Sequence, residues 1–175
     1  MFSDPEKNIS QFSVGKGTTV ADFGTGSGNY AFAAAEAVGE QGKVYAIDVQ
    51  KDLLLKLKNE AQERHLTNIE TVWADLDIVG GTKIREGIID QVIASNVFFQ
   101  LENKENSAKE IKRILKHGGR ALLIDWEDSF RGMGPEPKAV FDEIKAKELF
   151  EKVGFEYERD IEVGAHHYGL IFRKK

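Results

Sequence analysis

Three glycines at alternate positions, Gly24, Gly26 and Gly28, follow the apolar run 19–23 and precede an alanine-rich stretch that begins near Tyr30. A residue without a Cβ atom lets the backbone turn sharply and approach a ligand closely. The N–H groups at the start of the following helix point at the same place and favour an anionic group. A strand, a glycine turn and a helix in this order indicate a site for a nucleotide-like ligand, although glycine clusters also form ordinary turns.

Three acidic residues, Asp22, Asp48 and Asp75, stand at or near the ends of predicted strands. Open α/β sheets bind ligands outside the carboxyl ends of their strands, so these side chains should meet at one edge. Asp48 follows the glycine turn by about 20 residues, the offset of a ribose-binding carboxylate, which can accept from both ribose hydroxyls. Asp48 could instead begin the next helix, but Asp52 is the better candidate for that cap, and Asp75 could be an ordinary loop residue.

The glycine spacing distinguishes two classes of nucleotide site. Dinucleotide enzymes use G-x-G-x-x-G or G-x-G-x-x-A, and here Asn29 stands in place of the third small residue. The G-x-G-x-G spacing, with Asp22 two residues before its first glycine, resembles motif I of class I S-adenosylmethionine-dependent methyltransferases. The resemblance covers about residues 17–175, and the run 115–120 resembles the family's turn into its fifth strand.

This resemblance implies S-adenosylmethionine as the cofactor and S-adenosylhomocysteine as the product. It implies that the glycine turn accommodates the methionine part and that Asp22 binds its amino group through a charge-assisted hydrogen bond. It also implies that Asp75 accepts from the adenine amino group and that Leu76 covers the ring. The cofactor-binding residues that it predicts are Asp22, Gly24, Thr25, Gly26, Gly28, Asp48, Val49, Asp75, Leu76 and Asn96.

The run 93–101, which closes the fourth predicted strand, resembles motif IV of the same family, beside the transferable methyl group. The family's amino-group methylases often carry Asn or Asp followed by Pro-Pro and an aromatic residue, whereas Val97 and Phe98 follow Asn96 here. The resemblance is therefore closer to the branch that methylates small molecules, quinones and lipids, which implies a small-molecule or lipid-like acceptor. Asn96 either contacts the cofactor or the acceptor or is a simple turn residue.

The sequence does not assign a catalytic residue. A base is needed only if the acceptor must lose a proton, and the candidates are Asp125, His166 and His167. His166 and His167 are adjacent in a predicted strand, so they should point to opposite faces and cannot readily share one metal ion, and we predict no metal site. The aromatic side chains that either line an acceptor pocket or pack in the core, with core packing favoured, are Phe98, Phe99 and Trp126.

The composition restricts the class of protein. The chain has 175 residues, which suits a single domain, and its net charge of −5 argues against a nucleic-acid footprint over the whole surface. The absence of cysteine excludes disulfides, thiol nucleophiles and cysteine metal sites. No apolar run is long enough to span a membrane and no signal pattern opens the chain, so we expect a cytoplasmic protein, as a monomer or a homodimer.

Strands alternate with helices along the chain, which predicts βαβ units and a mostly parallel sheet with right-handed crossovers. We expect a Rossmann-like, doubly wound α/β fold with seven strands, helices on both faces and the antiparallel C-terminal hairpin that the methyltransferase family has. The predicted strands are residues 19–23, 43–48, 69–73, 88–95, 120–125, 155–163 and 167–173. The predicted helices are 30–38, 51–65, a segment that opens at Asn103 or Ser107 and is ended by Gly118 and Gly119, and 138–153.

Two segments outside this alternation could cover the ligand. In the leader, residues 1–17, Asp4 and Pro5 predict a helix start. Ile9 and Phe12 lie on one face of that helix and either staple the leader to the catalytic core at 18–175 or help to cover the ligand. The glycine- and proline-rich loop 126–137 is the other candidate lid. Since no larger cap is inserted, we expect an open pocket or one completed by a second subunit.

Three other functions stay open on the sequence alone. A methyltransferase acting on protein or RNA would share the same cofactor site, although the acidic charge balance disfavours RNA. An NAD-dependent oxidoreductase would share Asp48 but would need a better third glycine. A non-catalytic cofactor-binding module would keep Asp22, Asp48 and Asp75 and would lack turnover.

Overall fold

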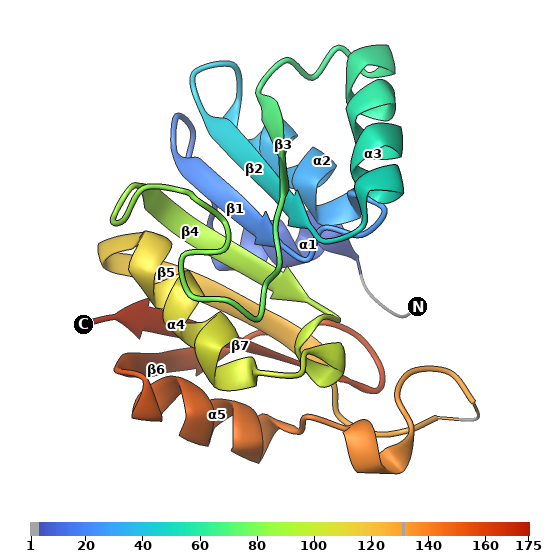
Figure 1. Cartoon of the computed structure of the whole chain (residues 1–175), viewed down its shortest axis with the longest axis vertical. Coiled ribbons are helices and arrows are strands. Elements are labelled where there is room, and N and C mark those ends of the chain that lie inside the picture. The colour runs from blue at the N-terminus through green and yellow to red at the C-terminus, as the bar shows by residue number, and fades with distance from the viewer. Residues whose placement is uncertain (1–3, 131) are drawn as a thin grey trace.

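The computed structural model describes residues 4–130 and 132–175, so the first three residues of the leader and Arg131 of the candidate lid lie outside the described part. A seven-stranded sheet crosses the protein in the order β3-β2-β1-β4-β5-β7-β6 (Figure 1). Neighbours among β1 to β5 pair in parallel, whereas β7 lies between β5 and β6 and is antiparallel to both. The predicted fold class is confirmed. The strands are β1 (Thr19–Phe23), β2 (Lys43–Asp48), β3 (Ile69–Trp73), β4 (Ile89–Ser95), β5 (Leu115–Trp126), β6 (Phe155–Asp160) and β7 (His167–Lys174).

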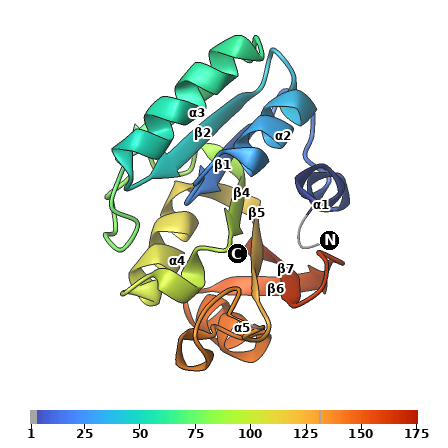
Figure 2. The same cartoon turned by 90° about the vertical axis from the view of Figure 1, so that its right-hand side faces the viewer.

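Helices cover both faces of this sheet (Figure 2). One buried apolar cluster joins the first three α-helices to the sheet, and a second cluster joins the last two to its other face. A mostly parallel sheet needs both faces covered, which explains why β1 and β4 are buried along nearly their whole length. The helices are α1 (Pro5–Phe12), α2 (Asn29–Val38), α3 (Lys51–Glu63), η1 (Phe98–Gln100), α4 (Lys104–Ile114), η2 (Pro137–Ala139) and α5 (Glu143–Lys152).

The unit formed by β1, the glycine turn and α2 packs tightly at the centre of the sheet. The alanines on the inner face of α2 are buried, which lets the helix axis approach the strands closely. Gly24 has a φ of +85°, and a Cβ atom at that position would lie 2.5 Å from Cγ2 of Val97. The turn therefore needs glycine there for two reasons, the left-handed backbone and the close approach of the segment after β4.

The leader helix α1 docks on the face covered by α2. The Asp4 carboxylate caps α1 by accepting from the Lys7 backbone N–H at 3.1 Å, as the sequence predicts. Ile9 and Phe12 are buried against α2 and the sheet, and the carbonyl of Phe12 accepts a hydrogen bond from Arg120 at 3.1 Å. The predicted stapling of the leader is confirmed.

Several element boundaries differ from the sequence prediction. β5 begins at Leu115, which pairs with Ile89, and α4 ends at Ile114, before the two glycines expected to terminate it. The last helix does not start at residue 138, because residues 137–139 form the short 3-10 helix η2 and Val140 after it is not helical. α5 begins only after Asp142, whose carboxylate caps the helix by accepting from the Lys145 N–H at 3.0 Å. A strong N-cap residue thus fixed the helix start later than the apolar pattern indicated.

Two local predictions were wrong. Gln50 is the N-cap residue of α3, and Asp52 lies inside the first turn, where a carboxylate interacts favourably with the helix dipole. β6 ends at Asp160, and His166 precedes β7 with a φ of 63°, so it belongs to the connection between the strands. The expectation that His166 and His167 point to opposite faces of one strand therefore does not apply.

Candidate functional site

A cavity of about 880 Å³ opens at the carboxyl edge of the parallel strands. This volume lies in the usual range for small-molecule sites, about 300–1,000 Å³. Its wall comes from the start of α1, the glycine turn, the ends of β2 and β3, and the segment after β4. Nine of the ten predicted cofactor-binding residues line it: Asp22, Gly24, Thr25, Gly26, Asp48, Val49, Asp75, Leu76 and Asn96.

The glycine turn forms an open cradle at the floor of this cavity. The N–H groups of Gly24 and Thr25 both donate to the carbonyl of Ile47 at 2.9 Å, which ties the turn to β2. At Gly26, with a φ of +52°, an added Cβ atom would meet nothing within 4 Å. Gly28 is the tenth predicted residue and lies beneath the cradle, where a Cβ atom would lie 2.7 Å from Cδ1 of Leu57. Gly28 thus sets the packing of α2 and α3, while Gly26 leaves space for a ligand.

Asp48 is held in place by backbone donors from two segments. Its Oδ2 atom accepts from the Gly26 N–H and its Oδ1 atom from the Gln50 N–H, both at 2.9 Å. A carboxylate has about four acceptor positions, so each oxygen can still accept from a ligand hydroxyl. The residue predicted to bind ribose is therefore fixed at the strand end, beside the glycine cradle.

Asp22 is almost completely buried at the bottom of the cavity, with 2% of its surface exposed. Its Oδ2 atom accepts from the Thr25 hydroxyl at 2.6 Å. Burial, and more weakly the neighbouring Asp48 carboxylate, raise the pKa of Asp22 to about 7, although the hydrogen bond from Thr25 opposes this. A buried acid beside a second acid is a favourable position for a positively charged ligand group, whose arrival would stabilise the ionised carboxylate.

The ends of β2 and β3 form one rim of the cavity. Leu76 is buried with 5% of its surface exposed, whereas Val49 is 54% exposed and offers an apolar surface beside it. The indole N–H of Trp73 donates to the carbonyl of Val49 at 2.9 Å and joins the two strand ends. Asp75 is exposed at the same rim, and its carboxylate accepts from the Asp77 N–H at 2.9 Å. An acid beside two apolar side chains suits an aromatic ring that carries an amino group.

Asn96 occupies the opposite wall, directly after β4. Its φ of 54° lies in the left-handed region, which Asn tolerates better than most residues, and its N–H donates to the carbonyl of Ile124 at 2.8 Å. The side-chain Oδ1 atom is buried and has no hydrogen-bond partner among the described residues. A buried acceptor that lacks a partner carries a cost of about 1–3 kcal/mol, which a ligand donor can relieve.

The candidate bases lie away from the cavity wall. Asp125 is fully buried, and the His166 ring is paired with Asp128 through contacts of 2.9 and 3.0 Å. Neither of these residues, nor His167, is among the described residues that line the cavity. Phe98, Phe99 and Trp126 do not line it either, and Phe98 is fully buried against Phe141 and Phe150. Core packing, the favoured interpretation of Phe98, is confirmed.

Two parts of the wall contain residues that the sequence analysis did not assign individually, although it named the leader as a possible cover for the ligand and the run 93–101 as part of the site. Asp4, Pro5 and Glu6 at the start of α1 line the cavity, so the leader both staples to the core and covers the site. Gln100, Leu101 and Glu102 line it as well, whereas no described residue of the candidate lid 126–137 does. The Asp4-Pro5 helix start was the available signal for α1, but the docking position of that helix depends on contacts distant in sequence.

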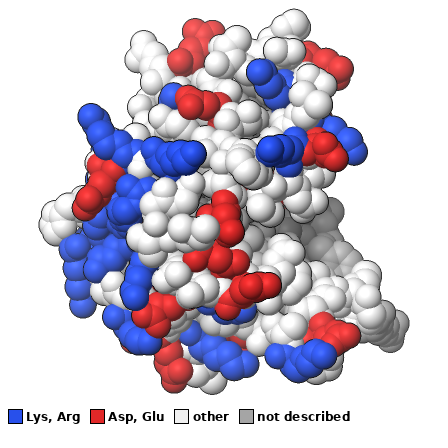
Figure 3. Space-filling model, in the orientation of Figure 1, with Lys and Arg blue, Asp and Glu red and all other residues white. Residues whose placement is uncertain are grey.

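The cavity is strongly acidic. Arg64, the one basic residue among its described lining, is engaged by Glu60 at 2.5 Å. Figure 3 shows that, on the face it presents, many Lys and Arg side chains gather on the side of the C-terminus, away from the carboxyl ends of the strands. Acidic walls favour a ligand with positive charge and disfavour phosphates. The acidic residues that line the cavity are Asp4, Glu6, Asp22, Glu36, Asp48, Asp75, Asp77 and Glu102.

The residues present fit S-adenosylmethionine, which carries a positively charged sulfur, an amino group, a ribose diol and an adenine ring. Asp22 would hold the amino group and Asp48 the diol, while the open space at Gly26 would admit the methionine part. Val49, Asp75 and Leu76 would enclose the adenine. The acidic lining also disfavours a ligand that carries a pyrophosphate. Within residues 4–130 and 132–175, no group of three or more His, Asp or Glu side chains is arranged to hold a metal ion.

Comparison with known proteins agrees with this chemistry. The family model described as "Methyltransferase domain" matches residues 15–161. A structure of a SAM-dependent methyltransferase from Aquifex aeolicus superimposes with a TM-score of 0.90, at 30% sequence identity, over 99% of this chain and 91% of that chain. No described helix is both long and apolar enough to cross a membrane.

Two curated relatives are similar over part of their length. The ubiquinone/menaquinone biosynthesis C-methyltransferase of Francisella tularensis subsp. novicida is 28% identical over 145 residues, which are 82% of this chain and 56% of that protein. An aklanonic acid methyltransferase from a Streptomyces species is 35% identical over 104 residues, which are 59% of this chain and 46% of that protein. This chain thus spans about half the length of the curated relatives it matches.

Proposed function

This chain belongs to the methyltransferase domain family, within the S-adenosylmethionine-dependent methyltransferases of class I, and we propose that it methylates a small, lipid-like acceptor such as a reduced quinone. The observation that carries the proposal is the convergence of Asp22, Gly26 and Asp48 on one acidic cavity. We propose that the ten residues predicted from the sequence form the cofactor site, with Gly28 acting through packing.

The proposed acceptor class has two supports. The printed names of the curated relatives refer to ubiquinone and menaquinone biosynthesis and to aklanonic acid, which are small molecules. The cavity wall is acidic and carries a single basic residue among its described lining, which disfavours polyanionic acceptors such as RNA.

S-adenosylmethionine, when bound, supplies a methyl group on a positively charged sulfur that an acceptor nucleophile displaces in line. The protein's own contribution is positioning, which can account for about 7–11 kcal/mol of such a barrier. Asp22 would hold the amino group at one end of the ligand and Asp48 the ribose in its middle, Asn96 offers an unpaired acceptor beside them, and the start of α1 forms part of the wall. The three candidate bases named from the sequence, Asp125, His166 and His167, do not line the cavity, so an acceptor with an acidic proton or an already ionised carbon or oxygen is favoured.

The proposal is tested with radiolabelled S-adenosylmethionine and three acceptors offered in parallel. These are a short-chain reduced naphthoquinone that lacks the ring methyl group, bulk RNA, and an undermethylated protein extract. We expect label in the naphthoquinone alone, and loss of that label in a Asp48→Ala variant. Label in RNA or protein with none in the quinol would overturn the acceptor class while preserving the cofactor assignment.

A single domain over 1–175, a cytoplasmic location and a monomeric or homodimeric state stay predictions from the sequence. The acceptor labelling experiment does not depend on any of them.

A further inference from the structure

The segment that follows β4 donates two backbone hydrogen bonds to residues at the end of β5. The Asn96 N–H donates to the carbonyl of Ile124 at 2.8 Å, and the Phe99 N–H donates to Oδ2 of Asp125 at 3.1 Å. The other carboxylate oxygen, Oδ1, accepts from the Trp126 N–H at 2.8 Å. One side chain thus connects η1, which follows β4, with the last residue of β5.

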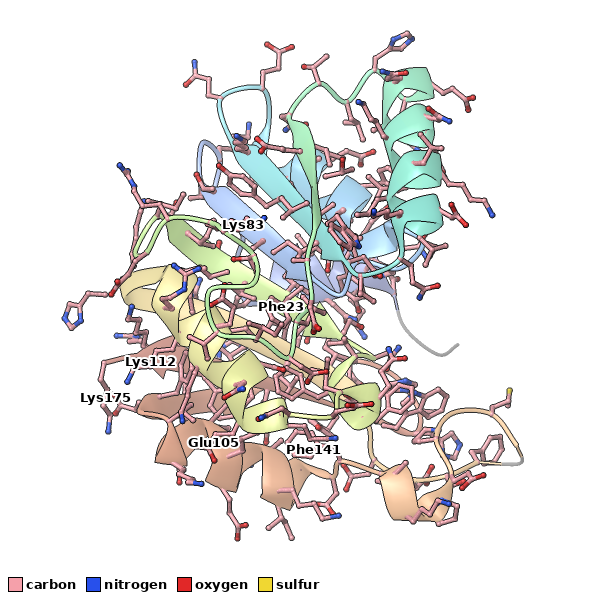
Figure 4. All side chains as sticks on the ribbon, in the orientation of Figure 1. Phe23, Lys83, Glu105, Lys112, Phe141 and Lys175 are labelled. Carbon is pink, nitrogen blue, oxygen red and sulfur yellow. The ribbon has the colours of Figure 1, made fainter. Side chains whose placement is uncertain are left out.

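This carboxylate lies in a closed, mostly apolar environment. Asp125 has no exposed surface, and Phe98 in front of it stacks on Phe141 with ring centroids 5.7 Å apart. Figure 4 shows Phe141 near the end of α4 at which Glu105 lies. The charged and titratable groups that act on Asp125 from the elements around it are Lys104 of α4 and Tyr168 of β7. Lys104 donates to the carbonyl of Leu101 at 2.7 Å and Tyr168 to the carbonyl of Phe141 at 2.6 Å.

The segment that Asp125 holds is part of the cavity wall. Asn96, Val97, Gln100 and Leu101 all line the cavity, whereas Asp125 itself does not. Phe99 lies in the middle of this segment, and its N–H is the group that Asp125 accepts. The position of four wall residues therefore depends on a carboxylate placed behind them.

We propose that Asp125 is a positioning residue, which fixes the wall formed by residues 96–101 and does not act as the general base. The proposal rests on the proposed function, because the wall matters only if the cavity binds a ligand. The residue type alone suggests a general base, whereas both carboxylate oxygens of Asp125 accept from backbone N–H groups.

The ionisation of Asp125 should influence this wall. Burial raises the pKa of Asp125 to about 7, while hydrogen bonds from backbone N–H groups and the charge of Lys104 oppose the shift. The ionised carboxylate accepts from both backbone donors with a full charge, whereas protonation removes that charge and leaves one oxygen, the hydroxyl, as a weaker acceptor. Hence the wall is held best above pH 7 and more loosely below it.

The first test compares wild-type protein with Asp125→Asn, using S-adenosylhomocysteine as the probe in calorimetric titrations at pH 8.5 and 5.5. We expect the variant to bind about tenfold more weakly at pH 8.5, because one backbone donor loses a charged acceptor. At pH 5.5 the affinities should differ by less than about twofold, since wild-type Asp125 is then protonated. Because Asp22 titrates in both proteins, its effect cancels in the ratio of their two dissociation constants at each pH. Equal affinities of the two proteins at pH 8.5 would overturn the proposal.

A matched control is Asp142→Asn. Asp142 also accepts from a backbone N–H, that of Lys145, but it caps α5 and does not line the cavity. We expect this variant to bind S-adenosylhomocysteine like the wild type at both pH values. Weaker binding by the control, equal to that of Asp125→Asn, would mean that general destabilisation explains the effect.

A second measurement needs no variant and decides the question if Asp125→Asn does not fold. In the wild type, the backbone amide resonances of Phe99 and Trp126 should move together between pH 5.5 and 8.5, with one midpoint near 7. The amide of Lys145 should stay constant over that range, because its partner Asp142 has a lowered pKa. Flat Phe99 and Trp126 resonances would overturn the proposal. If the wild type failed to bind S-adenosylhomocysteine, the proposed function would fall, and the amide titration would still decide whether Asp125 holds the wall.

Discussion

The two halves of the cavity are built from different kinds of interaction. On the side of β1, β2 and β3, the wall consists of a glycine turn and acids at strand ends, and each key acid is fixed by neighbours close to the turn. On the side of β4 and β5, the wall is a short segment held from behind by Ile124 and Asp125. The glycine spacing and the acids at strand ends identify most residues of the first half, whereas in the second half only Asn96 was predicted, because tertiary contacts hold that segment.

The largest effect should come from the turn that both halves share. In Gly24→Ala, the new Cβ atom would lie 2.5 Å from Val97 at a φ of +85°, so we expect a loss of about 2–4 kcal/mol in the free energy of unfolding. Gly26→Ala is the matched control, because its Cβ atom meets nothing within 4 Å. Chemical denaturation should show a smaller loss for Gly26→Ala, about 1–2 kcal/mol from its φ of +52° alone, together with weakened S-adenosylhomocysteine binding. Equal stability of the two variants would contradict the packing of the two halves against each other.

Asp22→Asn should separate stability from binding on the cofactor side. We expect S-adenosylhomocysteine to bind about 1.5–3 kcal/mol more weakly, because the amino group loses a charged acceptor. An acid whose pKa is raised to about 7 stabilises the folded state at low pH and loses this contribution as the pH rises from about 4 to 7.

The same variant should therefore melt at a higher temperature than the wild type at pH 8 and at nearly the same temperature at pH 4. Each kcal/mol relieved corresponds to about 2–4 °C for a chain of this length. Thermal melts at pH 8 and pH 4 check whether the ionised Asp22 carboxylate destabilises the folded state. A variant that melts lower at pH 8 would mean that Asp22 is stabilising in its ionised form.

Asp48→Ala tests the other anchored acid. We expect a loss of about 1–3 kcal/mol in S-adenosylhomocysteine binding, because the ribose hydroxyls and the N–H groups of Gly26 and Gln50 lose their acceptor. Asp52→Ala provides the comparison, since Asp52 lies in the first turn of α3 and does not line the cavity. Calorimetry should find the Asp52 variant unchanged, and an unchanged Asp48 variant would remove the ribose assignment.

Asn96→Gly should have the smallest effect on ligand binding, and it tests the wall on the side of β4 and β5. Glycine keeps the φ of 54° without strain and removes only the amide whose Oδ1 atom is buried without a partner. If a ligand donor pairs with that atom, S-adenosylhomocysteine binding should weaken by about 0.5–1.5 kcal/mol with little change in melting temperature. Unchanged affinity would assign Asn96 to the turn, or to the acceptor alone.

These differences explain what the sequence could predict. β1, β2 and β3 have the predicted bounds, because each is a short run rich in β-branched and aromatic residues with a glycine or an acid at its end or within two residues of it. The antiparallel hairpin was expected from the family resemblance. The start of α5 was missed because Asp142 competes as a cap with the apolar pattern that begins at residue 138.

The wall on the side of β4 and β5 could not be predicted, and the reason is physical. The role of Asp125 depends on which backbone N–H groups lie beside a buried carboxylate, and sequence spacing does not encode that arrangement. Likewise, Asp4, Pro5 and Glu6 reach the cavity only because Gln91 and Arg120 hold the carbonyl of Phe12, about 80 and 110 residues along the chain. Contacts of this kind appear only once the chain has folded.

The most direct test of the central claim is a calorimetric titration of the purified wild-type protein with S-adenosylhomocysteine, with NADH titrated in parallel. An acidic cavity that holds an amino group at Asp22 and a diol at Asp48 should bind the first ligand with micromolar affinity, on the order of −8 kcal/mol, and give no heat with the second. Binding of NADH together with silence from S-adenosylhomocysteine would contradict the account, because the glycine turn would then be accommodating a pyrophosphate.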